Sequence, residues 1–382
     1  MAVTGGAVAA VVLAVATVVA LSSGGDDDLG GADDSRALTD QDSPTTGPTQ
    51  GPGASTPAAS ANAPRLAWEK ELGEETIGTP STDGVRAYVG DSRGTVTALA
   101  LATGEQAWQV DVGDEATGSA PTVAGDAVIV SASEPSLVQA VEAASGVVRW
   151  TVPEVWTNEP AVVVGDTVVV SSSSRVTAIG LADGGIRWDS ELEDVDLWTG
   201  LELAGDLLVG GSSDGKVVAL DAATGAIRWV TPIPRGELTI WDVAVVGDHV
   251  LAYDDDGFVT GMPVATGADP WAVDAEASFP GSFGALGADA AVYLDSGELL
   301  VLHPATGTER RRLRDGSGTM LNLPGDPSLL VIAAPGALRA LDPDGAQAWS
   351  TELPVEGLTI AVGPGTLVVT DFEGNVAAYR LP

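Results

Sequence analysis

The chain contains no cysteine among its 382 residues. Disulfide bonds, thiolate metal sites and a cysteine nucleophile are therefore excluded, and the fold must be stabilised by packing. Histidine is almost as scarce, since only His249 and His303 occur, each without a second histidine or cysteine near it in the sequence. We therefore expect no metal site and no Ser-His-Asp triad. The acidic run 254–257 lacks the later glutamate of a calcium-binding loop and is interpreted as a hairpin turn.

Positive charge is also in short supply. The sequence has 17 Lys and Arg against 54 Asp and Glu, which gives a net charge of −37, and its only lysines are Lys70 and Lys216. So acidic a surface disfavours nucleic acid and anionic lipid as partners. We expect no nucleic-acid partner, and we expect contact with a membrane only through the N-terminal segment.

Capped, amphipathic helical patterns are missing after residue 64. Short β-branched runs follow turns that contain Gly and Asp, as where Gly125-Asp126 precedes Val128–Val130. This alternation is typical of antiparallel hairpins and predicts an all-β fold.

One sequence motif recurs along the chain: small-x-acidic-x-x-Thr-Gly-x-x-x-Trp, with its best copy at Ala219–Trp229. The copies begin at residues 98, 140, 178, 219, 261, 301, 340 and 378, so the steps run from 38 to 42 residues. A period near forty, built from four short strands, is typical of a propeller blade.

The two ends of the repeat array indicate how the ring closes. The last unit stops before its Thr-Gly-x-x-x-Trp strand, whereas an orphan strand at 65–72 carries Trp68 before the first unit. If this strand completes the last blade, the ring has no exposed edge. The sequence therefore predicts an eight-bladed β-propeller of four-stranded antiparallel blades over residues 65–382.

The first 64 residues have a different character. Residues 1–23 carry no charge and are mostly apolar, so they predict a single hydrophobic helix, either a transmembrane anchor or a cleaved signal segment. Residues 24–64 are rich in Pro, Ser, Thr and Asp and are interpreted as a disordered linker. This order predicts a single-pass protein of the cell membrane with its propeller outside the cytoplasm, or alternatively a secreted protein.

Seven of the ten tryptophans share one position of the repeat. A tryptophan at this position is expected to pack its ring between neighbouring blades while its indole N–H finds an acceptor. We interpret these residues as structural docking residues: Trp68, Trp108, Trp150, Trp188, Trp229, Trp271 and Trp349.

The repeat resembles that of the pyrroloquinoline-quinone (PQQ) enzymes, whose tryptophan-docking signature is Ala-x-Asp-x-x-Thr-Gly-x-x-x-Trp. Residues 219–229 match it at every fixed position, and the resemblance covers 65–382. It implies an eight-bladed quinoprotein-like propeller. The family includes dehydrogenases that hold PQQ and calcium at the ring centre. It also includes non-enzymatic propellers, among them the lipoprotein of the outer-membrane β-barrel assembly machinery.

The features that distinguish the dehydrogenases of this family are missing from the sequence. Their adjacent cysteines have no counterpart here, and the short, even steps leave no room for the long loops that build their active sites. No Glu, Asn and Asp motif for calcium can be carried over either. We therefore expect no bound cofactor, no catalytic residues and no enzymatic activity, with a PQQ-dependent dehydrogenase as the alternative.

The repeat motif does not account for two features of the sequence. Trp156, Trp198 and Trp241 precede the first strands of three successive blades, so they are expected to gather near the mouth of the central channel. They are either ligand-binding residues or apolar filling of the channel. A basic strand (Arg310, Arg311, Arg312 and Arg314) replaces a docking tryptophan and is either an interaction patch for an anionic partner or a solvated strand beside acids.

These expectations together favour a membrane-anchored, extracytoplasmic propeller that acts as a non-enzymatic binding or scaffolding module. Its partner would be a protein, a peptide or a small ligand at the propeller face. The alternatives are the quinoprotein dehydrogenase and an extracytoplasmic sensor head.

Overall fold

The computed structural model describes residues 63–381, except 114–119, 156, 158, 278–279, 315–318, 324–325, 335, 354–358, 364 and 372. The hydrophobic segment 1–23 and nearly all of the linker 24–64 lie outside the described residues. Within the described ranges, no helix is long and apolar enough to cross a membrane.

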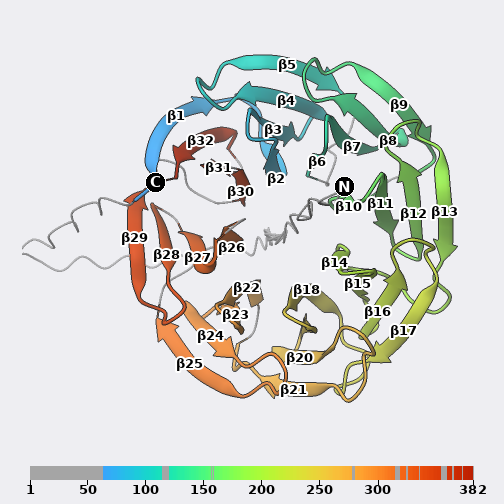
Figure 1. The fold of residues 1–382 in the computed structure, drawn as a ribbon, viewed down its shortest axis with the longest axis vertical. Helices are drawn as coiled ribbons and strands as arrows, with labels where there is room; N and C mark the ends of the chain where they lie inside the picture. The colour runs from blue at the N-terminus through green and yellow to red at the C-terminus, as the bar shows by residue number, and fades with distance from the viewer. Residues whose placement is uncertain are drawn as a thin grey trace, which may run out of the picture.

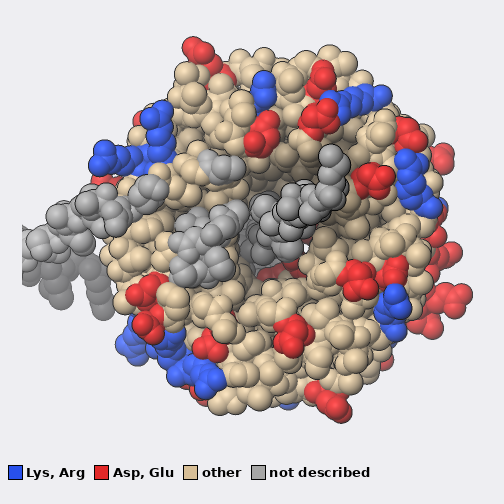
Figure 2. Space-filling model, viewed as in Figure 1, with Lys and Arg blue, Asp and Glu red and all other residues tan. Residues whose placement is uncertain are grey.

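Eight four-stranded antiparallel sheets are arranged as a ring about a central axis (Figure 1), and the face shown in Figure 2 is hollowed at its centre, the mouth of the central channel. The innermost strands are β2 (Thr76–Thr82), β6 (Thr122–Ala124), β10 (Val162–Val164), β14 (Glu202–Ala204), β18 (Ile240–Val246), β22 (Pro280–Leu286), β26 (Thr319–Leu323) and β30 (Thr359–Gly363). The second strands are β3 (Arg86–Asp91), β7 (Ala127–Ser133), β11 (Thr167–Ser172), β15 (Leu207–Gly211), β19 (His249–Asp254), β23 (Asp289–Leu294), β27 (Asp326–Ala334) and β31 (Thr366–Thr370).

The third and fourth strands form the outer half of each blade. The third strands are β4 (Thr95–Ala100), β8 (Ser136–Glu142), β12 (Arg175–Gly180), β16 (Lys216–Asp221), β20 (Phe258–Pro263), β24 (Glu298–Leu302), β28 (Ala337–Leu341) and β32 (Asn375–Arg380). The outermost strands are β5 (Gln106–Asp111), β9 (Val148–Pro153), β13 (Ile186–Glu191), β17 (Ile227–Pro232), β21 (Trp271–Asp274), β25 (Glu309–Arg314), β29 (Gln347–Glu352) and β1 (Arg65–Glu71).

The ring closes through the N-terminal strand, as the sequence predicted. β1 pairs antiparallel with β32 and completes the sheet β1-β32-β31-β30. Trp68 lies opposite Ala378, just as Trp229 lies opposite Ala219 in a blade built from continuous chain. β1 therefore occupies the place of a normal outermost strand, and the eight-bladed all-β fold is confirmed.

The hydrophobic core is divided into eight clusters, each shared by two successive blades. One of them joins Ala87 and Leu99 of the first blade to Val368 and Val376 of the closing blade. Burial of apolar surface between sheet faces is the main force that holds such layers together. The closing blade is therefore held by the same kind of interface as the others.

The glycine and tryptophan of the Thr-Gly-x-x-x-Trp motif make a contact between neighbouring blades. Trp68 covers Gly104 of the next blade so closely that a Cβ on this glycine would lie 2.8 Å from the indole ring, and Gly104 also has a positive φ of 72°. Both conditions require glycine. The Trp68 indole N–H donates to the Leu101 carbonyl at 2.8 Å. The same indole-to-carbonyl bond recurs for Trp108, Trp150, Trp229 and Trp271.

Arg311 takes over part of this task where the tryptophan is replaced. Its guanidinium donates to the carbonyls of Pro343 and Asp344, at the turn that a docking indole would contact. The space over Gly345 is filled by Leu313, which lies 2.6 Å from the position of a Cβ on that glycine. Arg311 and Leu313 of the basic strand therefore have a structural role, because they make the contact with the next blade that a docking tryptophan makes elsewhere.

Candidate ligand site at the mouth of the central channel

Trp198 and Trp241 lie on one face of the ring, beside the hairpins that join second and third strands. The Trp198 amide donates to the Gly211 carbonyl at 2.9 Å, at the end of β15. The Ile240 amide, next to Trp241, donates to the Ser212 carbonyl at 3.1 Å. The loops that enter β14 and β18 therefore share this face with the hairpin between β15 and β16, which belongs to the same blade as β14. Trp156 lies outside the described residues.

Trp198 and Trp241, which belong to two adjacent blades, contact each other. Their ring centroids are 5.7 Å apart and their planes meet at 89°, an edge-to-face pair. Trp198 is 50% exposed, and Trp241 is half-buried. A side chain that fills a core is not left half in solvent, so the exposure of Trp198 favours the binding interpretation over the filling of the channel.

A β-bulge turns Trp241 toward this site. Ile240 pairs with Asp254 and Asp242 with Tyr253, so Trp241 is an extra residue between two ladder pairs. Trp241 and Asp242 are both half-buried although they are consecutive, whereas Ile240 is fully buried. A bulge re-aims side chains in this way and is common beside functional sites.

Three carboxylates lie in the same arc: Glu159 precedes β10, Glu202 begins β14 and Asp242 belongs to β18. All three are half-buried. The Glu159 Oε2 atom lies 3.3 Å from the position that a Cβ on Gly200 would take, so it sits against the loop that carries Trp198. Neither Glu159 nor Glu202 forms a side-chain hydrogen bond or ion pair with a residue that the structure describes.

Burial perturbs the protonation of all three groups. Burial raises the pKa of Glu202 to about 8, and the neighbouring charge of Asp242 adds to the rise. Burial raises the pKa of Asp242 to about 7, opposed by the backbone amides of Val243 and Phe283 and reinforced by Glu159. Burial alone raises the pKa of Glu159 to about 7. Each carboxylate has lost part of the solvation that would hold its pKa low.

The sequence analysis did not single out these carboxylates. A signal was nevertheless present, because each of the three extra tryptophans is followed within four residues by an acid: Glu159 after Trp156, Glu202 after Trp198 and Asp242 after Trp241. The sequence predicted that Trp198 and Trp241 lie near each other, but not that acids lie beside them.

The arrangement does not fit a calcium ion with PQQ. In the part of the chain that the structure describes, no His, Cys, Asp and Glu side chains form a group of three that could hold a metal ion. The three carboxylates Glu159, Glu202 and Asp242 instead come from three different blades. PQQ is itself a polycarboxylate anion, so three acids without basic partners in the described ranges would repel it.

The two histidines have local structural surroundings. His249 Nδ1 lies 2.6 Å from Asp248 Oδ1, and His303 Nδ1 accepts the Ala305 amide at 3.2 Å. Asp254 Oδ1 accepts the amides of Asp256 and Phe258, so its acidic run forms the hairpin turn expected from the sequence.

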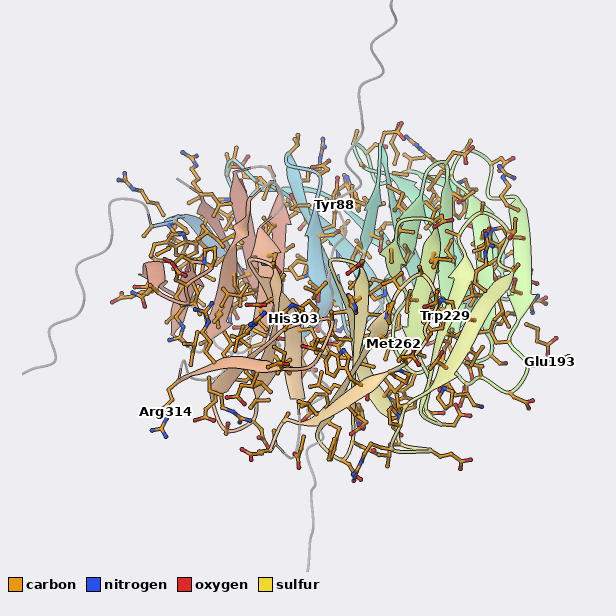
Figure 3. The ribbon with its side chains drawn as sticks, turned by 60° about the horizontal axis from the view of Figure 1, so that its bottom comes forward. Tyr88, Glu193, Trp229, Met262, His303 and Arg314 are labelled. Carbon is orange, nitrogen blue, oxygen red and sulfur yellow. The ribbon has the colours of Figure 1, made fainter. Side chains whose placement is uncertain are left out.

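The basic strand β25 finds acceptors within the chain. Arg312 lies 3.5 Å from Glu276 and 3.1 Å from Glu309, Arg310 lies 3.6 Å from Asp289, and Arg314 lies 3.4 Å from Glu298. Arg314 nevertheless projects from the outer surface (Figure 3). The contacts agree with a solvated strand that compensates nearby acids, and they leave less charge for an anionic partner.

A cleft of about 690 Å³ opens on the same face, between the third and fourth blades. Asp194, Asp196 and Asp214 line it together with Lys216. Lys216 is occupied, because its ammonium group donates to Asp214 and to the Asp194 carbonyl. In the view along the ring axis, Lys and Arg lie toward the outer edge, whereas some Asp and Glu lie nearer the central hollow (Figure 2).

The comparison with protein families decides the affiliation of the chain. The family described as "Outer membrane protein assembly factor BamB", a PQQ-type repeat family, matches residues 57–197 and 172–320. These two matches span more than half of the sequence. The chain belongs to the BamB family. No curated protein matches the sequence significantly.

Solved structures share the fold of this BamB-family propeller. BamB from Moraxella catarrhalis is 18% identical with a TM-score of 0.67, and the match covers 84% of this chain and 100% of that one. The computationally designed protein Ika8 is 16% identical with a TM-score of 0.69, covering 84% and 100%. The quinohemoprotein alcohol dehydrogenase from Comamonas testosteroni is 14% identical with a TM-score of 0.63, covering 84% and 78%. At such low sequence identity, the structural likeness shows a common architecture alone. Function has to be argued from the site.

Proposed function

We propose that this BamB-family propeller is a non-enzymatic binding or scaffolding module, anchored in the cell membrane by residues 1–23 with the propeller outside the cytoplasm. The binding part of the proposal rests on one observation, the half-exposed Trp198 in edge-to-face contact with Trp241. Exposed aromatic rings on a concave surface are typical anchors of ligands and partners.

Family membership supports the scaffolding role. The matching family is described as an assembly factor, which is a task of binding rather than of catalysis. A quinoprotein dehydrogenase is the second candidate, because one of the similar structures is a quinohemoprotein alcohol dehydrogenase. The acidic lining of the channel mouth, with Glu159, Glu202 and Asp242, makes that candidate the weaker one.

Chemical denaturation of Trp198→Ala tests whether Trp198 belongs to the packed core, which would exclude it from a binding surface. The side chain is half in solvent, so its loss should lower the free energy of unfolding by only about 1–2 kcal/mol. The matched control is Trp150→Ala, which removes a ring that is 9% exposed and whose indole N–H bonds to the Leu181 carbonyl at 2.8 Å. This docking residue should cost about 3–5 kcal/mol.

An equally large loss for both variants would show that Trp198 is part of the packed core. The proposed binding surface would then be wrong. A small loss for Trp198→Ala beside a large one for Trp150→Ala is the expected result.

A further inference from the structure

We propose that the channel mouth over β10, β14 and β18 binds an organic cation, an ammonium or guanidinium group, through the indole rings of Trp198 and Trp241 and the carboxylates of Glu159, Glu202 and Asp242. The inference rests on the proposed function, in that it names the chemical class of ligand for the same surface.

The aromatic half of the site suits a cation. The face of an indole ring carries negative potential, and tryptophan is the strongest cation–π partner among the side chains. In the edge-to-face pair, one ring points its edge at the other and keeps its own faces clear of that partner. The exposure of Trp198 makes this surface accessible from the ring face.

The acidic half of the site needs a cation. Glu202 and Asp242 repel each other, and Asp242 also feels the charge of Glu159. Half-buried carboxylates that stand together without a counter-charge destabilise a fold, and a positive group placed among them relieves that cost. A ligand cation would supply the partner that the described part of the chain does not.

The two halves form one contiguous surface. Trp241 and Asp242 are neighbours within the bulge of β18. Glu159 sits against Gly200, two residues after Trp198 in the same loop. Trp198 in turn contacts Trp241. An approaching group therefore meets aromatic and acidic atoms together.

The spacing of the acids favours an organic cation over a metal ion. Each carboxylate comes from a different blade, and among the described residues they do not form a metal-binding group. An ammonium or guanidinium group is larger and carries several N–H donors that point in different directions, so it can bond to separated carboxylates.

The surrounding charge favours the same ligand. The cleft on this face is lined by Asp194, Asp196 and Asp214, while Lys216 is already bonded to Asp214. The whole chain carries a net charge of −37. Such a field concentrates cations near the mouth and steers them toward it.

Calorimetric titration of the full chain tests the proposal with two sources of the same chemistry. The free cation is L-arginine amide, and the chain-borne cation is a short uncharged peptide with one arginine at its centre. The control ligand is that peptide with citrulline, a neutral isostere, in place of arginine. Titrations are run at about 0.15 M salt to screen the general field of the acidic surface. Wild type is compared with Trp198→Ala and Glu202→Gln.

Matched control variants remove similar groups from the outer rim. Glu193→Gln deletes a carboxylate that projects from the edge of the ring (Figure 3), and Ile227→Ala deletes an exposed apolar side chain of β17. Trp198→Ala and Glu202→Gln should each weaken binding by about tenfold, which is the size of one cation–π or charged hydrogen-bond contact. The two rim variants should leave it unchanged. Binding should also strengthen from about pH 6 to about pH 9, as the carboxylates ionise.

The outcomes separate the possible sources and the possible failures. Binding of both arginine ligands supports a site for a free cation, and binding of the peptide alone supports a site for a polypeptide side chain. Equal binding of the citrulline peptide, or equal losses for Glu193→Gln and Glu202→Gln, would overturn the proposal. If no probe binds while Trp198→Ala still costs little stability, the cation inference fails and the proposed binding function stands.

Discussion

Replacing Glu202 by glutamine should stabilise the propeller at alkaline pH and change little near pH 5. Burial raises the pKa of this carboxyl from 4.5 to about 8. Between these two values the folded protein holds a proton that the unfolded chain has released. Stability therefore falls as the pH rises through the window, by up to about 1.4 kcal/mol per pH unit, and the variant lacks this fall.

The size of the effect follows from the width of the window. A rise of roughly 3.5 pH units sets an upper limit of about 5 kcal/mol for the destabilisation by Glu202 above its folded pKa. Because the Glu202 side chain is only half-buried, solvent screens part of this penalty, and we expect a gain of about 2 kcal/mol for Glu202→Gln at about pH 8.5. Glu159 and Asp242, with pKa values raised to about 7, act in the same direction and remain in the variant.

Urea unfolding curves at about pH 5, 6.5 and 8.5 measure this difference. The control is Glu193→Gln, which removes the same charge from an exposed position on the outer rim. Parallel stability profiles for wild type and Glu202→Gln would refute the buried carboxylate. An equal gain for Glu193→Gln would show that relief of the overall negative charge, rather than the channel site, explains the result.

Two further predictions concern the cofactor and the membrane. With PQQ and calcium added, the purified propeller should retain no quinone absorbance after gel filtration and should show no dye-linked oxidation of alcohols or sugars, because its channel mouth is acidic; stoichiometric retention of PQQ would favour the dehydrogenase instead. Deleting residues 1–23 should move the protein from the membrane fraction to the soluble fraction while its thermal unfolding stays the same, and a full chain that fractionates as soluble would contradict the anchor.

Most of the fold could be predicted from the sequence because the contacts that build it are local and repeated. Six of the seven docking tryptophans pack against a glycine of the next unit, so the pair Trp68 and Gly104 reappears as Trp108 and Gly146 one period later. The unfinished last unit and the orphan strand with Trp68 then predicted the closing pair β1 and β32. The sequence showed an arginine in place of one docking tryptophan, but the contact of Arg311 with the carbonyls of Pro343 and Asp344 could not be predicted, since no other repeat uses an arginine there.

The site was less predictable because its members meet only after the ring has formed. Glu159, Glu202 and Asp242 are separated along the chain by about one repeat each, and none belongs to the docking motif. Their raised pKa values depend on burial and mutual repulsion at the channel mouth. The bulge at Trp241, which turns that side chain beside Asp242, depends on the pairing of β18 with β19. Both are properties of the assembled blades.

The separation of docking and channel residues explains how the fold can hold a costly site. The docking tryptophans lie on the outermost strands, and each joins its blade to the next one only, so the stability of the ring is close to a sum of terms between neighbours. The channel acids lie on or before the innermost strands β10, β14 and β18, away from every docking indole of those blades. Three successive blades can therefore place carboxylates and extra tryptophans at the mouth without disturbing the contacts that close the ring. The residual cost is local, and a bound cation is the kind of partner that would remove it.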